Sequence, residues 1–138
     1  MAKIRQVGER IFVGRLKQYD IEINPAQGRI MFALWQKDGI PINELAGRTQ
    51  LKKSTLTSML DRLAKLGYIK RLHSKEDRRK ILIKRTKKDR IMEEKYVEVS
   101  EEMTKLFYKG FSKSQIASLE KDLEQILNNL MEYEKNMV

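Results

Sequence analysis

The chain has no cysteine, one histidine and only two prolines among its 138 residues. The absence of cysteine excludes a disulfide scaffold, a thiolate metal site and a thiol redox sensor. A single histidine excludes most metal and catalytic sites that are built from imidazoles. The longest unbroken apolar run, residues 30–35, is far too short to span a bilayer. We therefore expect no metal, no cofactor and no membrane partner.

The sequence also lacks the features of a secreted protein or an enzyme. Residues 1–15 place charges among their apolar side chains and have no signal-peptide core, so the cytoplasm is the expected compartment. The acidic pairs at 93–94 and 101–102 are adjacent on an expected helix, where neighbouring side chains point apart. No nucleophile and base can be paired, and we expect no catalytic residues. At 41% hydrophobic residues, the chain can still build a core.

Positive charge is abundant and unevenly distributed. The whole chain has 29 Lys+Arg against 19 Asp+Glu, a net charge of +10. Residues 48–90 hold 16 basic and 4 acidic residues, a net charge of +12, whereas residues 91–138 hold 6 basic and 10 acidic residues. Charge runs are usually solvated faces, but a basic excess in so short a segment also indicates an anionic partner. Nucleic acid is the first candidate.

Few prolines and glycines favour helices. Residues 4–19 carry one apolar helical stripe. Asn24, Pro25 and Gln27 form a start signal for a second helix, with an N-cap, a proline at the first position and a capping-box glutamine. This helix ends at residues 38–39 and is apolar on more than one side, so we expect it at the centre of the fold. We expect Asn43 to cap a short third helix.

A longer helix, a hairpin and two further helices follow. The longer helix has apolar residues at 56, 59, 60, 63 and 66 and ends at Gly67. Two strands are expected at 68–73 and 80–86, joined by a charged turn. Thr86 and Asp89 resemble a second capping box, and Ser112 and Gln115 make a third. From 116 to 137 apolar residues recur at steps of three and four, which indicates a helix packed along a partner helix.

The central segment therefore has a helix, a turn, a helix and a hairpin, an arrangement that can read DNA. A helix fits the major groove, and its N-terminal residues reach base edges. The side chains available there for phosphate or base contacts are Lys52, Lys53, Ser54, Thr55, Thr57, Ser58 and Arg62. A narrow minor groove attracts arginine, and the hairpin tip offers Lys75, Arg78, Arg79 and Lys80.

Several short strings in residues 24–90 carry a resemblance to a known family. They are Asn24-Pro25-Ala26-Gln27, Asn43-Glu44-Leu45-Ala46, Lys53-Ser54-Thr55-Leu56-Thr57, Leu60-Asp61-Arg62-Leu63, Leu66-Gly67-Tyr68-Ile69, Glu76-Asp77-Arg78-Arg79 and Thr86. With this spacing the chain resembles the MarR family of winged-helix transcriptional regulators. The resemblance implies a mainly α fold with a small β part, a winged helix-turn-helix with flanking dimerisation helices.

The resemblance also implies an assembly and a set of functional residues. Residues 1–23 would form an N-terminal dimerisation helix, residues 24–86 the winged-helix DNA-binding domain and residues 87–138 the C-terminal dimerisation helices of a homodimer. In the family, an Asp-x-Arg pair in the wing directs the arginine to the minor groove, which corresponds to Asp77 and Arg79. Many members bind a small anionic or phenolic effector in a cleft beside the DNA-binding lobe.

Some residues keep two interpretations. Asp77 is equally suited to a plain turn role. His73 suits a strand end more than pH sensing or phosphate contact. The candidate effector-binding residues are Arg15, Tyr19 and Trp35, although a salt bridge is the commoner role for Arg15 and core packing for Trp35.

Four positions depart from the family pattern. Lys52 stands where a capping Asp or Ser is common, and Gln50 replaces the usual turn glycine. Arg85 occupies a strand position that is usually apolar, and Asp89 replaces a common glycine.

The sequence thus predicts a transcriptional regulator, a repressor in the first instance, that binds double-stranded DNA as a homodimer. Two-fold symmetry implies a pseudo-palindromic operator with half-sites about 10 bp apart. Two alternatives stay open: an architectural protein that binds DNA without sequence choice, and a helical protein-interaction module.

Overall fold

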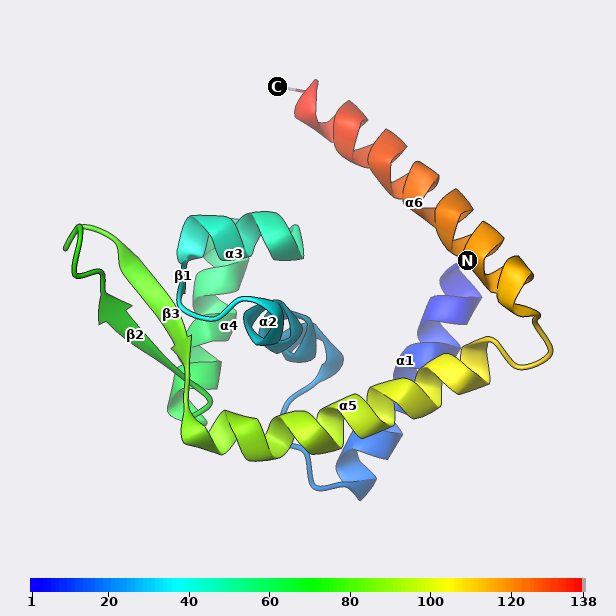
Figure 1. Ribbon diagram of the computed structural model, residues 1–138, viewed down its shortest axis with the longest axis horizontal. Helices are drawn as coiled ribbons and strands as arrows, with labels where there is room; N and C mark the ends of the chain where they lie inside the picture. Colours follow the sequence, from blue (N-terminus) through cyan, green and yellow to red (C-terminus); the bar gives the residue numbers. More distant parts are fainter. Residues whose placement is uncertain (138) are drawn as a thin grey trace. The chain divides into compact units, whose positions relative to one another are not determined.

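The computed structural model describes residues 1–137, which fold into helices and a small antiparallel sheet (Figure 1). The elements are α1 (Ala2–Gln18), α2 (Pro25–Gln36), β1 (Ile40–Pro41), α3 (Ile42–Thr49), α4 (Lys53–Lys65), β2 (Ile69–His73), β3 (Ile81–Arg85), α5 (Lys87–Phe107) and α6 (Lys113–Lys135). Residues 1–103 form one compact unit, and a second unit begins at Thr104. The predicted mainly α winged-helix class is confirmed.

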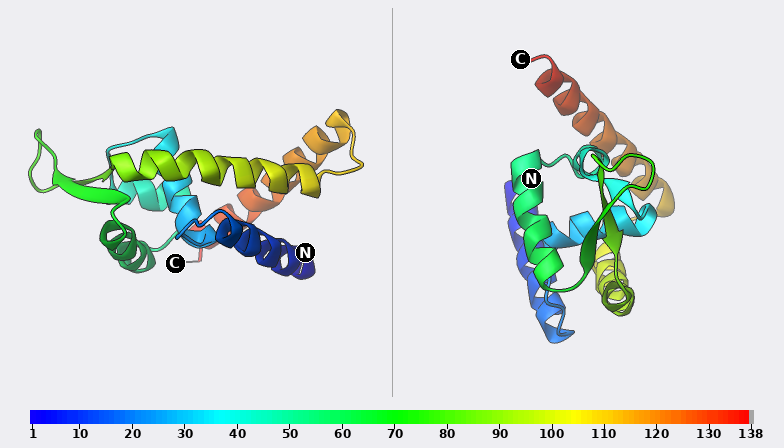
Figure 2. Two further views of the ribbon diagram at one scale, coloured as in Figure 1. Left: turned by 90° about the horizontal axis from the view of Figure 1, so that it is seen from below. Right: turned by 90° about the vertical axis from the view of Figure 1, so that its left-hand side faces the viewer.

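The sheet has the strand order β1-β3-β2, with both pairs antiparallel. In the β2–β3 hairpin, which we call the wing, Leu72 lies opposite Leu82 and Ile69 opposite Arg85. Ile40 of β1 pairs with Ile83. The sequence did not predict β1, because two residues are too few to show an alternating pattern. The wing extends past the helices α3 and α4 at one end of the first unit (Figure 2).

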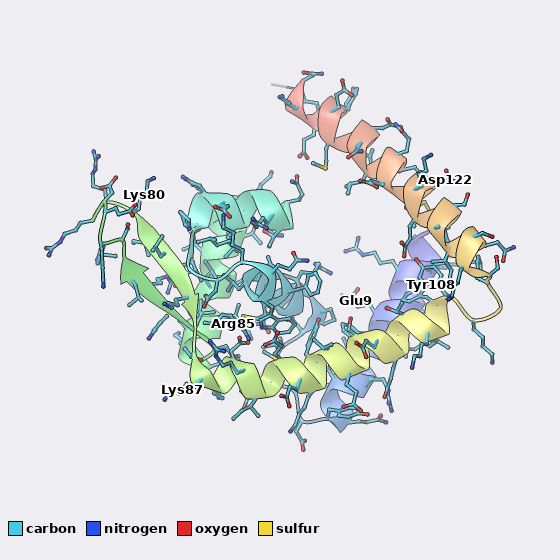
Figure 3. The ribbon with its side chains drawn as sticks, viewed as in Figure 1. Glu9, Lys80, Arg85, Lys87, Tyr108 and Asp122 are labelled. Atoms are coloured by element: carbon cyan, nitrogen blue, oxygen red, sulfur yellow. The ribbon has the colours of Figure 1, made fainter. Side chains whose placement is uncertain are left out.

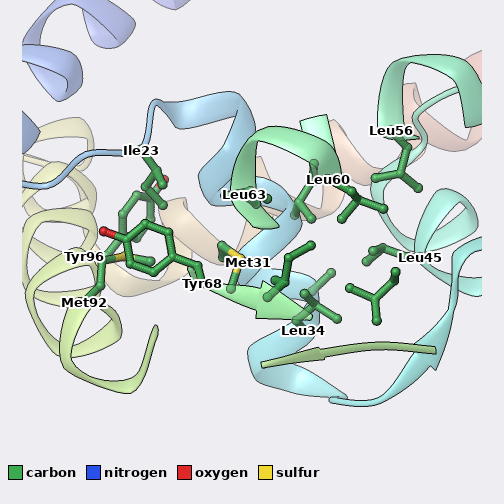
Figure 4. Close-up of a cluster of buried hydrophobic side chains, with 14 of the residues drawn as sticks. Ile23, Met31, Leu34, Leu45, Leu56, Leu60, Leu63, Tyr68, Met92 and Tyr96 are labelled. Carbon is green, nitrogen blue, oxygen red and sulfur yellow. The ribbon is translucent and has the colours of Figure 1, made fainter. Parts of the chain in front are cut away.

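The core of the first unit is built around α2, as its apolar character predicted. Ile30, Met31 and Leu34 are fully buried. The i, i+4, i+7 series Leu56, Leu60 and Leu63 of α4 is buried as well. Figure 4 shows Met31, Leu34 and the three leucines of α4 in one cluster with Tyr68, Met92 and Tyr96. Packing this stripe inward fixes which face of α4 points to solvent.

Helices α1 and α5 also contribute to this core. Leu16 of α1 and Val99 of α5 are buried, and the Tyr96 ring makes edge contacts with Phe12 and Trp35 at 5.5 Å between centroids. The Tyr96 hydroxyl lies directly against Gly28 of α2, where any Cβ would overlap it. The segments expected to form a dimer interface therefore also hold the DNA-binding lobe together.

Two of the capping predictions are confirmed and two are corrected. Complete capping boxes are present at the starts of α2 and α6. Asn43 is not a cap, because β1 pairing extends to Pro41, which is itself the N-cap of α3. The box at Thr86 is only half formed. Thr86 Oγ1 accepts from the Asp89 N–H at 3.4 Å, but the Thr86 N–H donates to the Tyr68 carbonyl, and the Asp89 carboxylate turns inward.

In the second unit, α6 leaves its apolar stripe open. No residue of α6 is buried, and Leu123, Ile126 and Leu130 are 42%, 44% and 64% exposed. The start of α6 is held by the Ser112 box and by a hydrogen bond from the Tyr108 hydroxyl to Glu120 Oε1 at 3.0 Å. Among residues 1–137, no helix is both long and apolar enough to cross a membrane.

Candidate nucleic-acid interface

The turn before α4 is formed without the glycine that is usual there. Gln50 itself adopts the left-handed conformation, with φ of 58°, and its side-chain amide donates to the Gly47 carbonyl at 2.8 Å. Lys52 is the N-cap of α4 and makes no side-chain capping bond. The first N–H groups of α4 therefore have no side-chain acceptor, and the positive end of the helix dipole favours an anion.

The outward face of α4 carries the predicted contact residues. Burial of Leu56, Leu60 and Leu63 leaves the following side chains exposed: Lys52, Lys53, Ser54, Thr55, Thr57, Ser58 and Arg62. The Thr57 hydroxyl donates its proton to the Lys53 carbonyl at 2.8 Å. Thr57 is therefore left as an acceptor, which suits the amino groups of adenine or cytosine in the major groove.

The same face carries one acid, Asp61, and the structure neutralises it. Arg71 of β2 donates to Asp61 Oδ1 at 2.6 Å. This pair removes a negative charge that would repel phosphates and joins α4 to the wing. Because the Asp61 side chain is 57% exposed, we assign it little effect on stability.

At the wing tip, Asp77 takes both roles that the sequence left open. As a turn residue, its Oδ1 accepts the Arg79 backbone N–H at 3.1 Å; it also accepts Arg79 Nε at 3.2 Å. These two bonds, the backbone one first, hold the pKa of the Asp77 carboxyl below its usual range. The Arg79 side chain is nevertheless 91% exposed. It therefore projects from the wing into solvent, while its Nε–H stays bonded to Asp77.

His73, the single histidine, makes one of the contacts that close the wing tip. His73 Nδ1 lies 2.9 Å from the Arg78 carbonyl, and the Ser74 N–H donates to the Lys80 carbonyl at 2.9 Å. Lys75, Arg78 and Lys80 are exposed. Figure 3 shows Lys80 near the tip and Arg85 at the other end of β3. His73 thus has a structural contact that shapes the tip, which favours the strand-end interpretation.

Two of the three effector candidates lie together. Arg15 forms an ion pair with Glu102, and the Tyr19 hydroxyl donates to Glu102 Oε1 at 3.2 Å. The Arg15 guanidinium stacks over the Tyr19 ring at 5.4 Å. Loss of hydration and the bond to Glu102 raise the pKa of Tyr19. The salt bridge that was the commoner expectation for Arg15 is therefore present.

Trp35, the third candidate, belongs to a different group of contacts that the sequence analysis missed. Its Nε1–H lies 3.1 and 3.0 Å from the two carboxylate oxygens of Asp89. Arg85 donates from Nε to Asp89 Oδ2 at 2.5 Å and from Nη2 to Glu93. Burial raises the pKa of Asp89, while the hydrogen bonds from Arg85 and Trp35 act in the opposite direction.

A signal for this cluster was present in the sequence. Arg85 and Asp89 both depart from the family pattern, and they stand four residues apart, a spacing that brings side chains together across the start of a helix. Considered one at a time, each residue is only a deviation from the family pattern. Within residues 1–137, no three His, Cys, Asp or Glu side chains are placed to hold a metal ion.

Comparison with known proteins shows which family the chain resembles. The sequence model of the MarR family matches residues 23–81, the segment from the α2 cap to the start of β3. The match covers 59 of the 138 residues, so the winged-helix segment of the chain is similar to the MarR family. The resemblance carried by the strings at 24–90 is thereby confirmed.

Curated regulators of transcription are similar to the chain in sequence. The chain is 36% identical over 86 residues to the transcriptional repressor YetL of Bacillus subtilis, covering 61% of this chain and 48% of YetL. It is 30% identical over 79 residues to the organic hydroperoxide resistance transcriptional regulator of the same bacterium, covering 57% and 54%. The chain thus spans about half the length of these curated relatives.

Solved structures match across nearly the whole chain, and one of them is bound to DNA. It is a cysteine-to-serine variant of MarR from Escherichia coli in complex with operator DNA. Its TM-score is 0.81 at 25% identity, and the match covers 91% of this chain and 89% of that one. These relatives are regulators of transcription, the class that the sequence predicted.

Proposed function

We propose that this protein is a MarR-family transcriptional repressor of the cytoplasm that binds double-stranded DNA as a homodimer. The observation that carries the proposal is the exposure of two groups of polar and basic side chains, one at the N-terminal end of α4 and one at the wing tip. The solved relative from Escherichia coli, which is bound to operator DNA, has the same fold over nearly the whole chain.

In this proposal α4 enters the major groove with its N-terminal end first. Lys52, Lys53 and Arg62 neutralise phosphates, and the uncapped N–H groups of α4 receive a phosphate oxygen. Ser54, Thr55 and Ser58 donate to or accept from base edges. Thr57 only accepts, because its proton is committed to the Lys53 carbonyl.

The wing contacts the flanking minor groove or backbone. Asp77 holds one edge of the Arg79 guanidinium, so the remaining N–H groups point away from the turn toward DNA. Lys75, Arg78 and Lys80 add positive charge around this contact. Phosphate contacts of this kind make the affinity strongly dependent on salt concentration.

The open apolar stripe of α6 supports the homodimer. Helical residues that are apolar at steps of three and four and 42–64% exposed, as Leu123, Ile126 and Leu130 are, require a partner surface. Ile4, Val7 and Ile11 of α1 form a second exposed apolar row. Two α4 helices related by a two-fold axis would then meet half-sites about 10 bp apart on a pseudo-palindromic operator.

An effector would act by changing the spacing of the two α4 helices. The Arg15–Tyr19 pair is the place for an anionic or phenolic ligand in this proposal. An anionic ligand would displace Glu102 from Arg15, so its binding would remove a contact between α1 and α5.

The test is a binding titration on DNA that the purified protein selects from its own genome by footprinting. Fluorescence anisotropy should show tight binding to this duplex and weak binding to an unrelated duplex of equal length. Equal affinity for both would mean an architectural protein. If the protein bound neither duplex and its α6 bound a different protein, the chain would be an interaction module.

A further inference from the structure

At its base the wing is bonded to helix α5 by the side chain of Arg85. Arg85 is the last residue of β3, and its side chain is only 11% exposed. Its guanidinium reaches Asp89 and Glu93, which stand on successive turns of α5. Its backbone N–H donates to Asp38 Oδ1, at 2.9 Å, in the loop between α2 and β1.

Trp35 extends the same group of contacts to α2. Its indole N–H lies within 3.1 Å of both oxygens of the fully buried Asp89 carboxylate. Three elements therefore meet at one carboxylate: β3 through Arg85, α2 through Trp35, and α5, which carries Asp89 itself. We call these four side chains, Trp35, Arg85, Asp89 and Glu93, the wing lock.

We propose that the wing lock is a positioning device for DNA binding, in which Arg85 sets the direction of the wing and thereby the place of Arg79. This inference rests on the proposed DNA-binding function. None of the four side chains needs to touch DNA. They act on Arg79 through the β2–β3 hairpin.

The geometry of a hairpin explains why its base controls its tip. The hydrogen bonds found for residues 73–80 join this tip to itself, whereas the Arg85 end is attached to three other segments. At about 3.3 Å per residue, Arg79 stands about 20 Å along the strand from Arg85. A tilt of about 5° at the base would move the tip by about 1.7 Å over that length, enough to spoil a hydrogen bond.

The chemistry of the wing lock is better suited to fixing the orientation of the wing than to stabilising the fold. A buried ion pair gives little net stability relative to apolar side chains of similar size, because both charges lose hydration. What it adds is geometry, since a planar guanidinium held by two carboxylates has one orientation. An apolar side chain at position 85 would pack without such a constraint.

The decisive experiment combines Arg85→Lys with two DNA-contact variants in the full-length protein. Lysine keeps the charge but cannot hold Asp89 and Glu93 with a planar fork. Affinity for the genome-selected duplex is measured by anisotropy for Arg85→Lys, Arg79→Ala, Lys53→Ala and the two double variants. Arg90→Lys, the same exchange at an exposed site of α5, is the control.

We expect Arg85→Lys to weaken binding about fivefold alone and less than about twofold in the Arg79→Ala background. In the Lys53→Ala background it should keep its full fivefold effect, because the bonds of the wing lock run to α2, α5 and the loop at Asp38 and not to α4. Arg90→Lys should change nothing. An effect of Arg85→Lys that is equal in all backgrounds, or absent, would overturn the proposal.

Trp35 gives a readout that does not depend on DNA, because it is the only tryptophan in the chain. Glu93→Gln removes one of the two carboxylate partners of Arg85 and leaves the Arg85–Asp89 pair in place, so it should fold even if Arg85→Lys failed to fold. We expect Glu93→Gln to change Trp35 emission and speed amide exchange at residues 81–85, while Glu94→Gln on the exposed face changes neither. Unchanged Trp35 emission and unchanged amide exchange in Glu93→Gln would overturn the wing lock, whether or not the protein binds DNA.

If Arg79→Ala binds DNA as tightly as the wild type, the wing contact of the proposed function is wrong, and the wing lock is not what has failed.

Discussion

Arg79 donates its backbone N–H and its side-chain Nε–H to the same carboxylate oxygen, Oδ1 of Asp77, at 3.1 and 3.2 Å. The backbone bond shapes the turn, and the side-chain bond aims the guanidinium. One acid thus links the conformation of the wing tip to the direction of the arginine that it exposes. Asp77 therefore shapes the turn and orients Arg79 through two hydrogen bonds that the same oxygen accepts.

The first prediction concerns the DNA contact of Arg79. Arg79→Ala should weaken binding of the genome-selected duplex by about 1–3 kcal/mol, because a groove contact is lost. Lys95→Ala removes the same charge from an exposed site of α5 and should have little effect. Anisotropy titrations at one moderate salt concentration compare the two. Equal losses would reduce the role of Arg79 to general charge, and no loss would remove it from the interface.

The second prediction concerns the titration of Asp77. Its pKa in the folded protein lies below the ordinary value of 3.8, chiefly through the backbone N–H of Arg79. A lowered carboxyl pKa stabilises the folded wing above the ordinary value, and this contribution is lost as the pH falls through the lowered pKa. Carbon-detected NMR titration of the carboxyl group measures it directly.

The Arg79→Ala variant sharpens this test. The backbone donor remains in that variant, so the pKa of Asp77 should rise relative to the wild type and still stay below 3.8. A pKa at the ordinary value in Arg79→Ala would show that the side chain, not the backbone, supplies most of the effect.

The third prediction tests the packing of α5 against α2. A Cβ on Gly28 would lie 1.9 Å from the Tyr96 hydroxyl oxygen, so the helices must separate or Tyr96 must leave its place. Gly28→Ala should lower the free energy of unfolding by about 1–3 kcal/mol, measured by urea denaturation. Gly47→Ala in α3 meets no atom within 4 Å and should be neutral or stabilising by up to about 1 kcal/mol. If Gly28→Ala behaved like Gly47→Ala, the close approach of Tyr96 would be disproved.

The fourth prediction tests the assembly. Leu123 is 42% exposed on the apolar stripe of α6, and a glutamate there should make the dimer dissociate because its charge would lose hydration in the interface. Gln125→Glu adds the same charge two residues on, on the opposite face of the helix, and should leave the dimer intact. Multi-angle light scattering of the purified proteins separates the two states. A dimeric Leu123→Glu protein would place the interface elsewhere.

The local structure of this protein was largely readable from short patterns. The boxes at Asn24 and Ser112 are closed by side chains three residues apart, so they form wherever the helix forms. The buried series at 56, 60 and 63 follows from helical periodicity alone. The prediction of Asn43 as a cap is wrong because Ile83, 43 positions along the chain from Ile40, pairs with Ile40, and the helix begins earlier.

The exposed residues of α4 and the wing tip were also named in advance, because amphipathic spacing decides which side chains remain in solvent. Their bonds to one another were not predictable to the same degree. The Asp61–Arg71 pair joins residues ten positions apart, and Trp35 meets Asp89 across 54 positions.

The sequence by itself determined the helices, the capping boxes at Asn24 and Ser112, the winged-helix order and the place of the positive charge, since all of these depend on neighbours within a few residues. Only the tertiary structure decided that Arg85 and Asp89, two apparent departures from a family pattern, are partners buried with Trp35. The reason is physical. A charge becomes tolerable in a core only when segments distant along the chain supply its hydrogen bonds, and that supply exists only after folding.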